Sequence, residues 1–80
     1  MATVRVKFTF PTELIKEPII YRLGQQFKVV PNIRRADVRE EMGWVILELE
    51  GDEEEIDRSI QWVGSQGVRV DPVSGDIIEG

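Results

Sequence analysis

The spacing of hydrophobic residues changes repeatedly along the chain, and each spacing is typical of one kind of element. From Thr3 to Phe10 hydrophobic and polar residues alternate, which predicts a strand with one buried and one exposed face. The buried face carries Val4, Val6, Phe8 and Phe10. Pro11 and Thr12 end this strand.

A helical spacing follows. Pro18 suits the first turn of a helix, where its missing N–H is not needed, and Gly24 suits the C-terminal cap. We therefore expect a helix from about Glu17 to Gly24. Its hydrophobic stripe comprises Ile19, Ile20, Leu23 and then Phe27.

The second strand, from Phe27 to Arg39, has an irregular pattern. Pro31 removes a backbone donor, which favours an edge strand or a bulge, and Asn32 is a poor strand former beside it. One interpretation of Asn32 is a bulge residue that satisfies its own backbone; the other is a side chain available to a ligand or partner. A turn is expected over 40–43, with Gly43 available for a positive φ.

Two further elements and a short strand complete the pattern. Trp44 to Glu50 alternates again, with Val45, Leu47 and Leu49 on one face. Asp52 and Glu55 resemble a capping box before a second helix that ends near Gln66, with Ile56, Ile60 and Val63 at helical spacing. Gly67 stops this helix and Val68–Val70 forms the last strand. The tail has a turn signal and one more apolar pair, Ile77-Ile78.

The order strand, helix, strand, strand, helix, strand predicts an α+β fold of the ferredoxin-like βαββαβ type. Short connections and right-handed crossovers place the strands antiparallel in the order 4-1-3-2, with both helices on one face. Residues 1–80 fit one domain.

The composition indicates which classes of partner the chain is expected to have. The chain has 10 Lys and Arg against 15 Asp and Glu, a net charge of −5, which disfavours nucleic-acid binding. No apolar run approaches the length of a membrane span, and the start lacks a signal peptide, so we expect a complete small cytoplasmic protein without direct membrane insertion. A core this small, without cysteine, favours a homodimer.

Catalytic residues are scarce. The chain contains neither histidine nor cysteine, and its carboxylates lie in solvent-facing positions, so we expect no enzyme activity. The acidic run over 52–55 lacks the alternating ligands of a calcium loop and suits the first turn of a helix instead. Neither a metal nor a cofactor is expected.

The open face of the predicted sheet carries charges and a tryptophan. Arg5 and Lys7 are placed to pair with Glu48 and Glu50 across the first and third strands. Trp44 and Ile46 have the opposite parity to the core positions of their strand. They form either an interface or ligand contact, or a patch that a loop or the Ile77-Ile78 tail covers. Trp62, beside the stripe of the second helix, is expected to pack.

At Val30-Pro31-Asn32-Ile33 the chain resembles the NIL domain, a family named for an Asn-Ile-Leu signature on its second strand. Three further segments resemble the family's first helix, third strand and last strand: Glu17-Pro18-Ile19-Ile20, the run from Val45 to Gly51, and Gly67-Val68-Arg69-Val70. Arg34 departs from the pattern, because the family prefers Leu there. Ala36 and Asp37 stand where a small residue and Asn are frequent.

The resemblance implies a function that the residues alone do not. NIL domains are ferredoxin-like, and those of methionine importers dimerise, bind methionine and inhibit transport; others accompany sulfur-transfer proteins. We therefore expect a free-standing regulatory domain that binds a small molecule, an amino acid resembling methionine, as a homodimer, with a transporter or sulfur-transfer protein as partner. The alternative is a protein-interaction module without a ligand. The expected ligand-binding residues are Asn32, Ile33, Arg34 and Trp44. Arg34 and Arg35 suit a carboxylate, since guanidinium is a bidentate donor.

Overall fold

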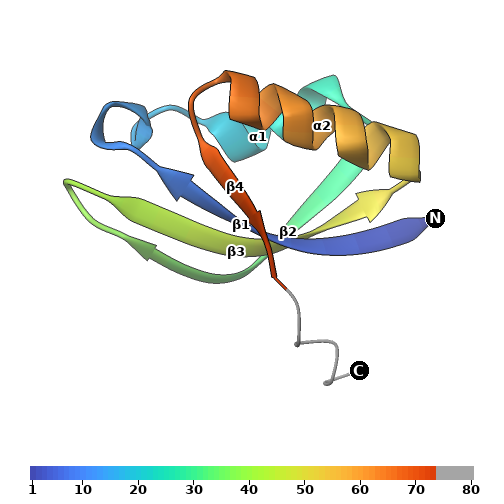
Figure 1. Ribbon diagram of the computed structural model, residues 1–80, viewed down its shortest axis with the longest axis horizontal. Coiled ribbons are helices and arrows are strands. Elements are labelled where there is room, and N and C mark those ends of the chain that lie inside the picture. Colours follow the sequence, from blue (N-terminus) through green and yellow to red (C-terminus); the bar gives the residue numbers. More distant parts are fainter. Residues whose placement is uncertain (74–80) are drawn as a thin grey trace.

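The computed structural model describes residues 1–73 and forms one sheet covered by two helices (Figure 1). The strands lie in the order β2-β3-β1-β4 and every neighbouring pair is antiparallel. The predicted βαββαβ order and strand arrangement are confirmed. The elements are β1 (Ala2–Phe10), a 3₁₀ turn η1 (Thr12–Leu14), α1 (Ile19–Gln26), β2 (Val29–Val38), β3 (Gly43–Gly51), α2 (Glu53–Ser65) and β4 (Arg69–Pro72).

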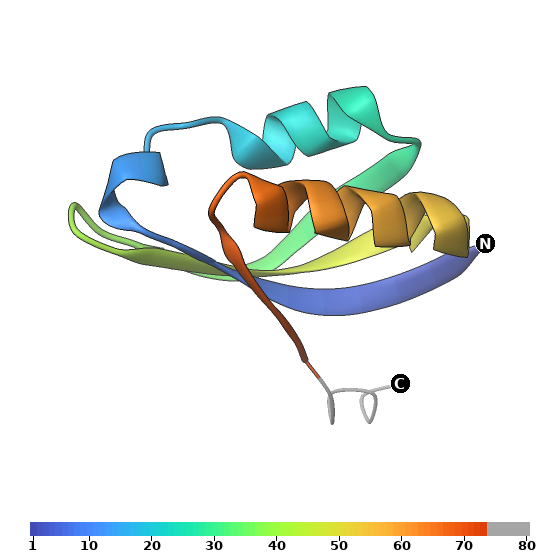
Figure 2. The same ribbon diagram turned by 45° about the horizontal axis from the view of Figure 1, so that its top comes forward.

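The core lies between the helices and one face of the sheet (Figure 2). On the two central strands, Val6 is directly opposite Leu47 and Phe8 is opposite Val45. Each of these side chains is buried because the alternation turns it toward α1 and α2. The other buried hydrophobic residues are Phe10, Ile19, Leu23, Val29, Leu49, Ile56, Val63 and Val68.

β2 is an edge strand, as Pro31 predicts, and it contains a bulge. Its register with β3 passes from the pair Ile33–Leu47 to the pair Arg35–Ile46, so Arg34 is the extra residue. The bulge therefore lies at Arg34 rather than at Asn32, which pairs with Glu48 in regular register.

Two details of the predicted helix ends and turns are wrong. Gly24 does not end α1, which continues to Gln26 with Phe27 as its C-terminal cap. Gly43 belongs to β3 and has no positive φ; among the glycines of residues 1–73, the one with a positive φ is Gly67, at 100°, after α2.

The predicted capping box at α2 is also wrong. Asp52 occupies the N-cap position, but its side chain makes no capping hydrogen bond. Glu55 instead accepts a hydrogen bond at 2.9 Å from the backbone N–H of Lys28, on the segment that leads into β2. A tertiary partner therefore replaces the local one, although the acidic first turn still complements the helix dipole.

The tail positions Ile77 and Ile78 lie outside the described residues. Within residues 1–73, none of the helices is long and apolar enough to cross a membrane. Trp62 packs as predicted: its ring centroid lies 6.0 Å from that of Phe27, against the core.

Candidate ligand-binding site

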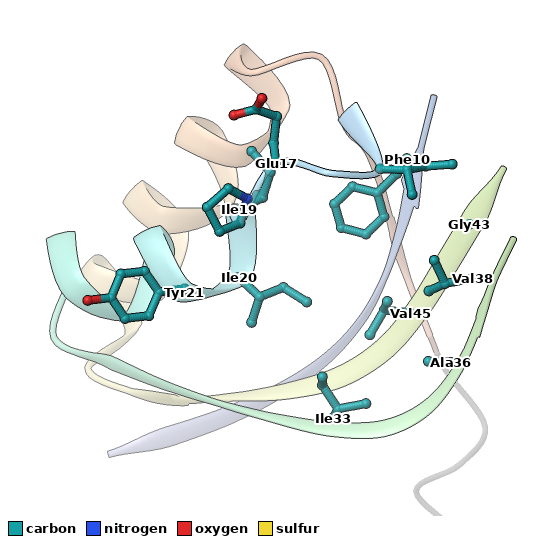
Figure 3. Close-up of a pocket in the computed structure, with 12 residues that line it drawn as sticks. Phe10, Glu17, Ile19, Ile20, Tyr21, Ile33, Ala36, Val38, Gly43 and Val45 are labelled. Carbon is teal, nitrogen blue, oxygen red and sulfur yellow. The ribbon is translucent and has the colours of Figure 1, made fainter. Parts of the chain in front are cut away.

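An apolar cavity of about 270 Å³ opens between the start of α1 and the far end of the β2–β3 ribbon (Figure 3). Its sides come from elements distant in sequence: the end of β1, the segment before α1, the first turn of α1, and β2 with β3. The lining residues are Phe10, Ile15, Glu17, Pro18, Ile19, Ile20, Tyr21, Ile33, Ala36, Val38, Gly43 and Val45.

The cavity has a buried floor and an exposed rim. Phe10, Ile19 and Val45 belong to the hydrophobic core and form the floor. Ile33 and Val38, on the edge strand, are 54% and 57% exposed and form the rim. Exposed aliphatic side chains beside a hollow are typical of a surface that another molecule covers.

The opening exists because α1 begins late. The chain leaves β1 at Pro11, makes η1 and reaches the first residue of α1 only at Ile19. Figure 2 shows the β2–β3 ribbon extending beyond the helical layer at this end. Ala36 and Val38, on this part of β2, line the cavity.

Polar groups are sparse at this cavity. Glu17 is the charged residue among those that line it, and its Oε1 lies 3.2 Å from Nη1 of Arg22 in an ion pair. Figure 3 shows the Glu17 carboxylate at the helix side of the cavity, away from the strands. The lining suits a small molecule with an apolar body, and Glu17 is the charged group among the lining residues that is nearest to such a molecule.

The four residues expected to bind a ligand do not meet at one place. Ile33 lines the apolar cavity on the helix-facing side of the sheet. Asn32 lines a separate polar hollow of about 350 Å³ on the opposite side, and its lining also includes Thr3, Val30, Pro31, Glu48 and Glu50. The alternation of β2 separates these two adjacent residues.

Arg34 and Trp44 also belong to the open face. The hydrogen bond from Arg5 lowers the pKa of Glu48, and partial desolvation opposes this shift; Arg34, the bulge residue, adds a smaller electrostatic lowering. Trp44 is half-buried outside the core, as its parity predicts. The Nζ atom of Lys7 lies 5.2 Å from the centroid of its ring.

The predicted charge pairs on this face are partly confirmed. Arg5 forms an ion pair with Glu48, its direct partner across β1 and β3. Lys7 does not pair with Glu50, because Lys7 is opposite Ile46 and Glu50 is opposite Thr3. The lysine lies over the Trp44 ring instead.

Most cavity residues were not identified as functional from the sequence. Phe10, Ile20 and Val45 were assigned only to hydrophobic faces, and their spacing gives no sign that they border a cavity. The available signal was Ile33, which stands in the family motif. Among residues 1–73, no cluster of three or more acidic, histidine or cysteine side chains is placed to hold a metal ion.

Comparison with known proteins identifies the family. The family model described as the NIL domain matches residues 4–72. The fold is similar to the crystal structure of the C-terminal domain of an ABC transporter ATP-binding protein from Enterococcus faecalis, with a TM-score of 0.78 and 22% sequence identity over 90% of this chain and 84% of that chain. No curated protein matches the sequence. Since the model match spans nearly all the residues that the structure describes, the chain belongs to the NIL domain family.

Proposed function

We propose that this chain is a regulatory domain that binds a small molecule, an amino acid resembling methionine, in the apolar cavity beneath α1. The observation that carries the proposal is the open cavity of about 270 Å³. Ile33, a residue of the family motif, lines this cavity. Sites for drug-sized ligands have volumes of about 300–1,000 Å³, so this cavity suits a smaller molecule. Its apolar walls favour an unbranched or aliphatic side chain.

The charged end of the ligand is assigned to the mouth of the cavity. Glu17 lines the cavity, and it forms a half-exposed ion pair with Arg22 of α1, with side-chain exposures of 45% and 43%. A zwitterion presents an ammonium group to Glu17 and a carboxylate to Arg22. The two contacts with the ligand offset the loss of the one internal pair, and the hydrophobic side chain adds the driving force.

The proposal includes a homodimer formed along the edge of β2. Val30, Ile33 and Val38 are exposed on this edge strand, at 62%, 54% and 57%. A second copy that covers the edge removes these side chains from water, and Ile33 and Val38 also form the cavity rim. Dimerisation and ligand binding are therefore coupled. The domain acts in the cytoplasm on a transporter or sulfur-transfer partner, without catalysis of its own.

The test combines ligand screening with a cavity-filling variant. Methionine and leucine are expected to raise the melting temperature, while aspartate and glycine are not, because selective binding to the native state stabilises it. Ala36→Leu places a larger side chain in the cavity and is expected to weaken methionine binding by about tenfold or more, since overpacking costs about 1–3 kcal/mol. Calorimetry measures the affinity.

Asn32→Ala is the matched control, because Asn32 lies on the same exposed strand but faces the other side. Binding that survives Asn32→Ala and is lost in Ala36→Leu supports the cavity. The reverse pattern assigns the ligand to the polar hollow beside Glu48, as the sequence predicts for Asn32. Absence of any amino-acid effect, together with β2-edge association, favours the alternative of a ligand-free interaction module.

A further inference from the structure

The open face of the sheet carries a cluster of cations around an aromatic side chain. Trp44 projects from β3, and the two flanking strands supply a cation each: Lys7 Nζ lies 5.2 Å and Arg35 Cζ lies 6.0 Å from the ring centroid. Ile46, two residues further along β3, is opposite both Lys7 and Arg35 in the ladder. We call Lys7, Arg34, Arg35, Trp44 and Ile46 the cationic patch.

Among residues 1–73, the cations of this patch form no ion pair, although Asp71 lies opposite Lys7 and Asp37 lies opposite Trp44 in the ladder. Other arginines on or next to the sheet form ion pairs: Arg5 with Glu48, Arg39 with Asp37, and Arg69 with Asp71. Within residues 1–73, no such pair involves Lys7, Arg34 or Arg35. Three positive charges beside half-buried aromatic and aliphatic side chains are therefore left without an ion-pair partner among the described residues, and an external anion can pair with them.

The distribution of charge over the molecule favours the binding of an anionic partner to this face rather than to the helical side. The whole chain has a net charge of −5, and the first turn of α2, on the other side of the sheet, carries Glu53, Glu54 and Glu55. An acidic partner is repelled from the helical side and attracted to the patch, so electrostatics fixes the orientation of docking. A nucleic acid is disfavoured as the partner. Its backbone carries many phosphates, and those beyond the three cations would be repelled by the net negative charge of the chain.

We propose that the cationic patch docks an acidic segment of a partner protein. Carboxylates of that segment pair with Lys7, Arg34 and Arg35, and an apolar side chain between them packs on Trp44 and Ile46. The half-buried tryptophan supplies contact area at low entropic cost, and the arginines supply bidentate donors. This surface lies on the opposite side of the sheet from the apolar cavity, so it is independent of the proposed ligand site.

The probe is a ten-residue peptide of alternating Glu and Leu, compared with a peptide in which each Glu is replaced by Gln. In a Trp62→Phe background the fluorescence of Trp44 reports binding directly. The acidic peptide is expected to change this fluorescence saturably, and the Gln peptide is not. Binding should weaken as salt rises, since the contacts are exposed ion pairs.

Paired charge variants locate the binding face. Lys7→Gln with Arg35→Gln is expected to weaken peptide binding by about tenfold. The control pair is Lys16→Gln with Arg58→Gln, which changes the net charge equally; Lys16 precedes α1 and Arg58 lies on α2. The control is expected to change affinity by less than about twofold, because screened charges on the far side contribute little. Circular dichroism confirms that both variants fold.

Three outcomes overturn the proposal. Equal weakening in the two charge pairs shows attraction to net charge alone. Equal binding of the Gln peptide shows that the apolar surface acts without the cations. Tighter binding of oligouridylate than of the acidic peptide shows a nucleic-acid face instead. Ala36→Leu, which alters the cavity, is expected to leave peptide affinity unchanged, so failure of the ligand proposal does not affect this test.

Discussion

β2 and β3 are neighbours that pair along nearly their whole length, yet they differ sharply in burial. Along β3 the side chains alternate between buried and partly exposed, whereas on β2 only Val29 is buried. β3 lies between two strands and beneath the helices, while β2 has a free edge and extends beyond α1. Hydrophobic side chains on β3 therefore stabilise the fold, and those on β2, such as Ile33 and Val38, remain available for binding.

The largest expected effect separates two residues that are direct cross-strand partners. Leu47 is 0% exposed and Ile33, opposite it, is 54% exposed. Leu47→Ala is expected to lower the free energy of unfolding by about 3 kcal/mol or more, because it leaves a cavity in the core. In the monomer, at protein concentrations too low for a second copy to cover β2, Ile33→Ala is expected to cost less than about 1 kcal/mol, since little of its area is buried within one chain. Urea denaturation measures both, and similar losses would show that β2 is covered in solution.

A second comparison uses the two glycines at the ends of β3. A Cβ on Gly51 would lie 2.7 Å from the carbonyl oxygen of Lys28, whereas a Cβ on Gly43 would lie 3.4 Å from Val38. Gly51→Ala is expected to destabilise the domain by about 1–3 kcal/mol, because backbone must move. Gly43→Ala is expected to be nearly neutral. Thermal unfolding of the two variants measures the difference in stability. A neutral Gly51→Ala would mean that the backbone at the start of β2 moves aside at little cost in free energy.

The smallest expected effect concerns Glu48 on the open face of the sheet. This residue of β3 lies between Arg5 of β1 and Asn32 of β2. Its pKa is lowered from the usual 4.5, chiefly by the hydrogen bond from Arg5. A lowered folded-state pKa contributes stability above the unfolded-state value, and this contribution disappears as the pH falls through the folded-state value. The native chain is therefore expected to lose stability below about pH 4.5 more steeply than Glu48→Gln.

Melting temperatures between pH 7 and pH 3 test this difference. The control is Glu50→Gln, two residues further along the same strand and opposite Thr3. Its acid profile is expected to follow that of the native chain more closely. Identical profiles for the native chain and Glu48→Gln would show that the Arg5 contact does not hold the carboxylate in solution.

Much of the fold was predictable because its signals are local. Alternation identified the strands and their faces, so Val6, Leu47 and Trp44 were assigned to the correct sides of the sheet. Pro31 identified the edge strand, because a residue without an N–H is excluded from a central ladder. Helix ends were less predictable. Gly24 lies inside α1, where a Cβ atom at this position would lie 3.5 Å from the ring of Pro31.

The candidate site was only partly predictable. The motif directed attention to Asn32, Ile33 and Arg34 as one group, but the pleat turns Ile33 to the cavity and Asn32 to the polar hollow. The bulge then keeps Arg34 near Glu48 on the open face. Adjacent residues on a strand face opposite sides, so proximity in sequence does not imply a shared site.

The sequence by itself determined the order of elements, the hydrophobic face of each strand and the edge position of β2, since each depends on periodicity or on a single backbone donor. Only the tertiary structure decided that a cavity opens between Ile19, Ile33 and Val45, because this depends on where α1 begins relative to the end of the β2–β3 ribbon. Likewise, only the assembled sheet brings Lys7 and Arg35 to the Trp44 ring, because the register of three strands sets these distances.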